Sequence, residues 1–217
     1  MSNEIRPAIQ DTRERILATG ECLILGKGFS AMGLSELLSA AAVPKGSFYH
    51  YFASKEAFGV ALLERYFRDY QQKTALLFDA QDISAKQKLM LYFYQWRSLA
   101  DVPGCNKLCL GVKLAAEVSD LSDAMRQALS TGMALHCDQI AAVIRDAIQE
   151  GSIAPVSDPA ELASFLYGSW IGASILAKVR QDAGALHAAH RQTMQALFGN
   201  ALQGCTHRRQ GQEQADT

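Results

Sequence analysis

The chain has 217 residues and a formal net charge of −1, and 49% of its residues are hydrophobic but only 8% aromatic. This length suits a small domain joined to a larger one, and the near-neutral charge by itself does not indicate a nucleic-acid-binding protein. No apolar run approaches about 18 residues, and residues 1–7 lack an apolar segment, so the sequence predicts neither a membrane span nor a secretory signal. We expect a cytoplasmic protein whose five cysteines are mostly reduced.

Helical spacing of apolar residues recurs along the chain and strand-like alternation is absent, which predicts an all-α fold. The first helix is predicted to start at a capping box, Asp11-Thr-Arg-Glu14, followed by an apolar run. Gly26-Lys-Gly28 should end it, because glycine tolerates the left-handed conformation that closes many helices. Leu34, Leu37 and Leu38 then lie on one stripe of a second, short helix.

A third helix is predicted within residues 43–55, which read V-P-K-G-S-F-Y-H-Y-F-A-S-K. Phe48, Tyr51 and Phe52 share one face, as packing on a small core requires. The other face is small or able to hydrogen bond, and the stretch contains no Asp or Glu. Such a helix, a few residues after a short one, is typical of the recognition helix of a helix-turn-helix. From these residues alone, an ordinary amphipathic helix remains the alternative.

Ser54 can cap a fourth, long helix that passes through Phe58 and Tyr66. This order of helices over residues 11–70, and above all the run K-G-S-F-Y-H-Y-F-x-S-K-E, resembles the DNA-binding domain of TetR-family repressors. Two positions depart from the usual family pattern. Ala42 stands where a glycine commonly makes the turn, and Met32-Gly-Leu stands where Ser or Thr usually caps the second helix. Alanine enters a left-handed turn only at an energetic cost.

The resemblance implies an N-terminal three-helix helix-turn-helix domain (1–53), a C-terminal helical sensor and dimerisation domain (54–203) and a disordered tail (204–217). It implies DNA-backbone contacts from Lys45, Tyr49, His50 and Lys55, and base-edge contacts near Lys45, Gly46 and Ser47.

Further helices are predicted at 84–101, 105–118, 122–150, 158–181 and 184–203, with Ser122 and Asp158 at two of the starts. In the family the last two helices form a dimer interface, which implies a homodimer on palindromic double-stranded operator DNA. The interface residues expected from this pattern are Leu162, Phe165, Leu166, Ser169, Ile171, Ala173, Leu176, Leu186, Met194, Leu197 and Phe198. The alternative is that both helices only complete a monomeric core.

A second informative region surrounds Cys109, which lies four residues before Lys113 and can share a helix face with it. A cationic neighbour near a helix start favours the nucleophilic thiolate. The run from Cys109 to Ser122 resembles that of TetR-family members that repress detoxification genes and respond to electrophiles or reactive chlorine through a cysteine. The resemblance implies Cys109 as the sensor, with Cys105 and Lys178 as possible partners, although Ser119 stands where a second cysteine would be.

Other interpretations stay open at this stage. A free cysteine is usually a small buried hydrophobe, which is what we expect of Cys22 and Cys137. A reversible hydrophobic effector is the alternative inducer, bound by Tyr66, Tyr70, Tyr92, Trp96 and Trp170 unless these aromatics simply form core. The sequence shows no nucleophile with an orienting base, no metal cluster and no phosphate-binding glycine loop, so we expect neither an enzyme nor a bound cofactor or metal.

Overall fold

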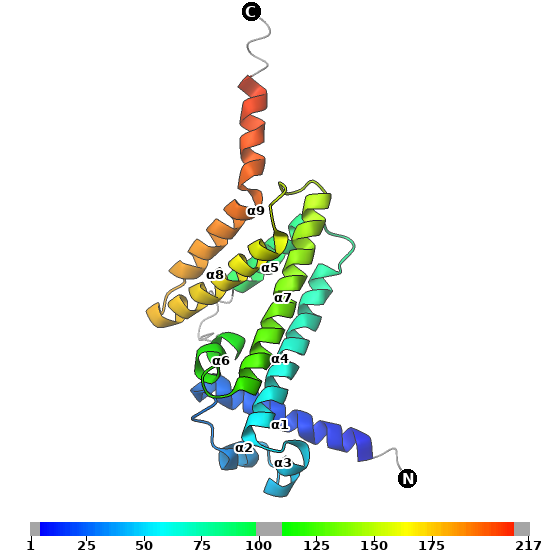
Figure 1. Ribbon diagram of the computed structural model, residues 1–217, viewed down its shortest axis with the longest axis vertical. Helices are drawn as coiled ribbons and strands as arrows, with labels where there is room; N and C mark the ends of the chain where they lie inside the picture. The colour runs from blue at the N-terminus through cyan, green and yellow to red at the C-terminus, as the bar shows by residue number, and fades with distance from the viewer. Residues whose placement is uncertain (1–4, 99–109, 211–217) are drawn as a thin grey trace, which may run out of the picture. The chain divides into compact units, whose positions relative to one another are not determined.

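The computed structural model describes residues 5–98 and 110–210, and over these residues every regular element is an α-helix (Figure 1). The helices are α1 (Ile5–Lys27), α2 (Leu34–Ala40), α3 (Lys45–Tyr51), α4 (Lys55–Phe78), α5 (Ala85–Ser98), α6 (Leu110–Val118), α7 (Asp123–Gln149), α8 (Pro159–Arg180) and α9 (Gly184–Gln210). The all-α prediction is confirmed. The chain divides into two compact units, one of residues 1–70 and 107–134, which we call the head unit, and one of residues 71–106 and 135–217, the body unit.

Helix α1 begins earlier than the sequence predicted. It starts at Ile5, so Asp11 and Glu14 lie inside the helix and the predicted capping box is wrong. Pro7 does not prevent the earlier start, because the first N–H groups of a helix have no intrahelical partner to lose. The Glu14 carboxylate instead pairs with the guanidinium of Arg65 on α4. A second ion pair, from Arg65 to Glu21, also joins α4 to α1.

The helix boundaries around the helix-turn-helix follow the predicted local signals. Gly28 has a φ of 96° and ends α1, and the Ser54 hydroxyl accepts a hydrogen bond from the Ala57 N–H at the start of α4. Gly33 caps α2 with its backbone alone, because no side chain there accepts a hydrogen bond. Ala42 makes the turn between α2 and α3 with a φ of 52°, the left-handed conformation that was predicted to be costly.

One hydrophobic core holds the head unit together. Ile16 and Leu17 of α1, Leu37 of α2 and Phe48 of α3 are all fully buried in it. The first half of α4 enters the same core through buried side chains that include Phe58. Helix α6 and the start of α7 also contribute buried residues to it, among them Leu114, Val118 and Met125. The head unit therefore extends past residue 53.

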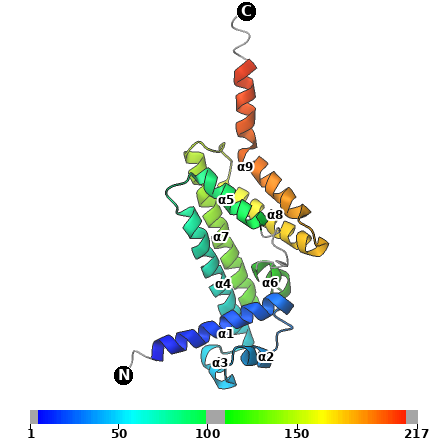
Figure 2. The same cartoon turned by 180° about the vertical axis from the view of Figure 1, so that it is seen from behind.

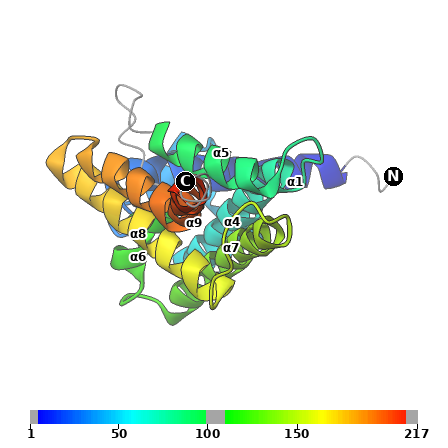
Figure 3. The same cartoon turned by 90° about the horizontal axis from the view of Figure 1, so that it is seen from above.

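The body unit packs α8 against α9, and α5 against α9, as Figures 2 and 3 show from two directions. Asp158 caps α8 by accepting from the Ala160 N–H, and Pro159 follows at the first helical position, as predicted. Helix α9 continues to Gln210, beyond the predicted end at residue 203.

A buried polar pair lies in the body unit. The hydroxyl of Tyr92 and Nε2 of His136 are 2.7 Å apart, and His136 is fully buried. Burial lowers the pKa of His136 to about 4, against a hydrogen bond with Gln139 that acts in the opposite direction. The imidazole is therefore neutral at pH 7 in the folded protein.

Helix α8 is long and apolar enough to cross a membrane by length and composition alone. Its apolar residues lie on two faces of the helix, one buried and one exposed. Leu166, Trp170 and Ala173 are buried inside the body unit, whereas Phe165 and Val179 are exposed.

Replacing Ala42 by glycine is expected to stabilise the protein by about 1 kcal/mol, because glycine adopts a positive φ without the steric cost that alanine bears. Urea unfolding measures the difference in free energy of unfolding. Ala40→Gly, at the exposed end of α2, is the control and should destabilise by a few tenths of a kcal/mol or more. A destabilising Ala42→Gly would show that the turn is not strained.

Stability is expected to fall as the pH drops from 6.5 to 4, with His136 contributing about 3 kcal/mol of the loss. In that window the unfolded imidazole binds a proton that the folded one, with its lowered pKa, does not bind. Urea unfolding at several pH values should show a steep slope for the wild type and a shallower one for His136→Gln. Equal slopes for the two proteins would contradict this account.

Candidate nucleic-acid interface and sensor region

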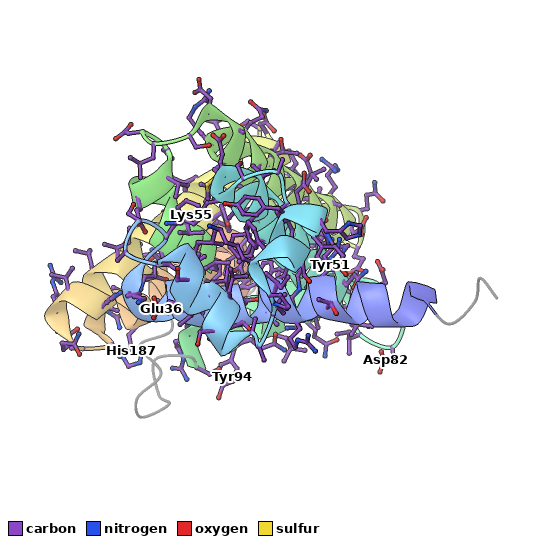
Figure 4. All side chains as sticks on the ribbon, turned by 90° about the horizontal axis from the view of Figure 1, so that it is seen from below. Glu36, Tyr51, Lys55, Asp82, Tyr94 and His187 are labelled. Carbon is purple, nitrogen blue, oxygen red and sulfur yellow. The ribbon has the colours of Figure 1, made fainter. Side chains whose placement is uncertain are left out.

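The orientation of α3 is set by aromatic packing. Phe48 and Phe52 are both buried, and their ring centroids lie 5.9 and 5.3 Å from that of Phe58 on α4. Tyr51 is half-buried beside them, so the predicted apolar face of α3 is the buried one. Figure 4 shows α2 and α3 from below, with Tyr51 labelled on α3. With one face fixed against α4, the opposite face of α3 points to solvent.

That solvent face carries five of the six residues predicted to contact DNA. Lys45, Gly46, Tyr49 and His50 are exposed and Ser47 is half-buried. Tyr49 is 50% exposed. Helix α3 contains no acidic residue. The result is a short helix with hydrogen-bonding groups and one lysine on its open face.

Gly46 has no folding reason to be glycine. A Cβ built on it would meet no atom within 4 Å, and its φ is not positive. Glycine in a helix costs about 0.5–1 kcal/mol relative to alanine. A surface that must approach another molecule closely would explain why the side chain is missing there.

Lys55, the sixth predicted DNA contact, is held differently. Its ammonium lies 3.4 Å from the Ser30 carbonyl oxygen and 4.8 Å from the centroid of the Phe29 ring. The side chain is half-buried at the start of α4, and Figure 4 labels it. Lys55 therefore has a structural role in joining α4 to the turn that follows α1.

The predicted sensor residues are only partly within the described structure. Cys105 and Cys109 lie outside the described residues. Lys113 is on α6, where its ammonium donates to the Leu25 carbonyl oxygen at 2.5 Å. Lys178 is half-buried in the last turn of α8. The two lysines belong to different compact units.

The other cysteines with described side chains are Cys22 and Cys137, and they differ from each other. Cys22 is exposed, so its prediction as a buried core residue is wrong. Cys22 lies on the solvent side of α1. In the sequence it stands between Glu21 and Leu23, and the buried Ile24 follows. Cys137 is half-buried, and burial raises the pKa of its thiol, so it is a poor nucleophile at neutral pH.

The structure also shows a residue that sequence reasoning missed. Glu117 on α6 accepts hydrogen bonds from the backbone N–H groups of Phe29 and Ser30, at 3.0 and 2.6 Å. Its partners are backbone groups far away in the chain, and no side-chain pattern announces such a contact. The glycine at position 28 is the nearest signal, because its positive φ precedes the two N–H groups that point toward α6.

The five aromatic residues proposed for an effector pocket are divided between the two compact units. Tyr66 and Tyr70 stack on each other in the head unit, whereas Tyr92, Trp96 and Trp170 belong to the body unit. Trp170 is fully buried.

The polar atoms of the body-unit aromatics already have partners. The Trp170 indole N–H donates to the Thr193 hydroxyl at 2.9 Å, and the Trp96 indole N–H donates to the Ser174 hydroxyl at 3.2 Å. This arrangement is typical of a packed core. Among the described residues, no group of three His, Cys, Asp or Glu side chains is placed to hold a metal ion.

Comparison with known proteins agrees with this geometry. Residues 16–62 match the family of bacterial regulatory proteins described as the tetR family, and residues 85–193 match the tetracyclin repressor-like C-terminal domain. The chain is 43% identical over 176 residues to the HTH-type transcriptional repressor NemR of Escherichia coli K12, a match that covers 79% of this chain and 86% of NemR. It is 31% identical to the repressor DhaR of Mycobacterium sp. GP1, over 78% of this chain and 84% of DhaR.

A solved structure gives the same result. The crystal structure of the reduced form of E. coli NemR superposes with a TM-score of 0.80 at 42% identity, over 84% of this chain and 95% of that one. These relatives are transcriptional repressors and not enzymes. The chain belongs to the TetR family of helix-turn-helix transcriptional repressors.

Proposed function

We propose that this protein is a cytoplasmic, dimeric repressor that binds a palindromic operator through α3 and is released when an electrophile or oxidant modifies Cys109. The observation that carries the DNA-binding part is the acid-free outer face of α3, fixed by the burial of Phe48 and Phe52. In this proposal Lys45, Tyr49 and His50 contact the phosphate backbone of the DNA, and the N-terminal turn of α3 contacts the base edges.

Close approach of the α3 backbone to DNA is the proposed reason for Gly46. Gly46→Ala is expected to raise the free energy of unfolding by about 0.5–1 kcal/mol, because the site is open and alanine favours helix. The same change should weaken operator binding by about tenfold, roughly 1.4 kcal/mol, since the methyl group occupies the interface. Urea unfolding and fluorescence anisotropy measure the two effects. A variant that binds operator as tightly as the wild type would show that α3 does not approach DNA at this residue.

The proposed dimer interface is an exposed stripe on α8. Phe165 is 66% exposed and Val179 is 74% exposed, and Leu176 is exposed between them on the same helix face. Gly168 and Gly172 lie along the stripe, and a Cβ on either would meet nothing within 4 Å. An exposed apolar stripe with small residues at its centre suits close packing against a second copy of the helix.

The stripe differs from the interface expected from the sequence. Of that set, Phe165 and Leu176 are exposed, as an interface requires. Four others are buried within the body unit and hold it together instead: Leu166, Ala173, Leu186 and Leu197. Periodicity could not separate the two faces, because both faces of α8 are apolar.

Leu176→Arg is expected to convert the dimer to a monomer at micromolar concentration, because it places a charge in an apolar interface. Sedimentation velocity measures the mass, and operator binding should weaken at least tenfold because two half-sites are no longer bound together. Ala160→Arg, exposed on α8 but outside the stripe, is the control and should remain dimeric. A dimeric Leu176→Arg protein would place the interface elsewhere.

The sensing part of the proposal has two supports. The NemR relative was solved in a form described as reduced, which favours thiol chemistry in this branch of the family. Cys109 also directly precedes α6, and α6 is packed in the same core as the recognition helix. Lys113, four residues after Cys109 in the same unit, is the proposed partner of the Cys109 thiol. The alternative, a reversible hydrophobic effector, leaves the thiol without a role.

Operator binding by proteins treated with N-ethylmaleimide separates the two inducers. The experiment requires a Cys22→Ser background, because exposed Cys22 would also react. In that background the reagent should weaken binding at least tenfold, and the further change Cys109→Ser should abolish the effect. Release that persists in Cys109→Ser would assign the response to another thiol. An unchanged affinity in both proteins would overturn thiol sensing and leave the reversible effector.

A further inference from the structure

Two side chains of α6 hold the C-terminal end of α1 at neighbouring points. The Glu117 carboxylate accepts from the Phe29 and Ser30 N–H groups, and the Lys113 ammonium donates to the Leu25 carbonyl oxygen. Lys113 and Glu117 are four residues apart and therefore share one face of α6. We call these two side chains with their three backbone partners the α6 clamp. All of them lie in the head unit.

The clamp replaces a hydrogen bond that α1 gives up where it ends. In a continuing helix, the Phe29 N–H would donate to the Leu25 carbonyl. Here α1 stops at Lys27, so Glu117 takes the N–H and Lys113 takes the carbonyl. Each side chain also carries the charge that its partner group favours, because helix C-termini attract cations and exposed N–H groups attract anions.

The backbone is shaped to receive the carboxylate. Gly28 has a φ of 96°, which turns the next two N–H groups toward α6. A Cβ on Gly28 would lie 2.8 Å from a carboxylate oxygen of Glu117, so only glycine permits this approach. Burial raises the pKa of Glu117, but the Ser30 and Phe29 hydrogen bonds and the Lys113 charge outweigh it and leave the pKa lowered. Glu117 is therefore an anion at neutral pH.

The clamp lies between the two functional parts of the head unit. On one side, Phe29 and Ser30 lead directly into α2 and the helix-turn-helix. On the other side, α6 begins at Leu110, the residue after Cys109. Apolar contacts of Leu114 and Val118 also hold α6 in the core, so loss of the clamp should leave the fold intact.

We propose that Glu117 and Lys113 are positioning residues for operator binding, by which α6 fixes the end of α1 and thus the position of the helix-turn-helix. The inference rests on the proposed function and extends it. The clamped junction is the state competent to bind DNA, and a displacement of α6 by chemistry at its N-terminal end reaches the recognition helix through these two residues. Without the clamp, the reduced and the modified proteins share the same loosened junction.

The test compares Glu117→Gln with Glu64→Gln in the full chain carrying Cys22→Ser. Glu64 is exposed on α4, so its variant makes the same charge change away from the clamp. Without DNA, amide hydrogen exchange at Phe29 and Ser30 should be at least tenfold faster in Glu117→Gln than in the parent protein. Glu64→Gln should exchange at the parent's rate. Exchange at the wild-type rate would mean that the clamp does not form, and would overturn the proposal.

Operator affinity before and after N-ethylmaleimide gives the second readout. Untreated Glu117→Gln should bind about threefold to tenfold more weakly than the wild type, and its response to the reagent should shrink to less than a third of the wild-type ratio. Glu64→Gln should respond as the wild type does. A purely structural role would lower the melting temperature without changing the response ratio.

The outcomes for the inference and for the proposed function are distinct. Wild-type affinity and response in Glu117→Gln would overturn the positioning role while leaving the repressor intact. A parent protein that binds no operator would instead overturn the proposed function. A parent that binds but does not respond to the reagent would remove thiol sensing, and the affinity of untreated Glu117→Gln would then decide the positioning role.

Discussion

The packing of three aromatic rings, Phe48, Phe52 and Phe58, is the interaction on which the function of this molecule depends. Helix α3 is too short to be stable alone, so its conformation and orientation come from tertiary packing. Burial of Phe48 and Phe52 on one side leaves the lysine, tyrosine and histidine on the other side no position except the surface. The hydrophobic core and the proposed DNA-binding surface are therefore two faces of the same short helix.

The same core extends from the recognition helix to α6. Buried residues of α1, α2, α3, α4, α6 and α7 form one hydrophobic cluster, so apolar packing is continuous between α6 and the recognition helix. Polar contacts also join α6 to one specific point, because Glu117 and Lys113 on α6 bind backbone groups at the end of α1. A repressor needs this kind of connection between the place where a signal arrives and the place where DNA is bound.

Local signals in the sequence predicted much of the head unit. Glycine at the end of α1, Ser54 at the start of α4 and the left-handed Ala42 all behave as their chemistry indicates. The predicted start of α1 was wrong, because a capping-box pattern can also occur inside a helix. There Glu14 pairs with an arginine from another helix. The prediction that Cys22 is buried was wrong for a related reason, since a cysteine within an apolar run can still face solvent. The Glu117 contact could not be predicted, because its partners are backbone groups 87 and 88 residues away.

Footprinting on the DNA upstream of the protein's own reading frame shows whether α3 of two subunits reads a symmetric DNA site. We expect two protected half-sites of inverted sequence, with centres about one duplex turn or a multiple of a turn apart. We also expect protection to disappear together in both half-sites as salt is raised, since phosphate contacts contribute to each. A single protected site without symmetry would contradict the dimeric operator complex, and uniform protection at every salt concentration would contradict sequence recognition by α3.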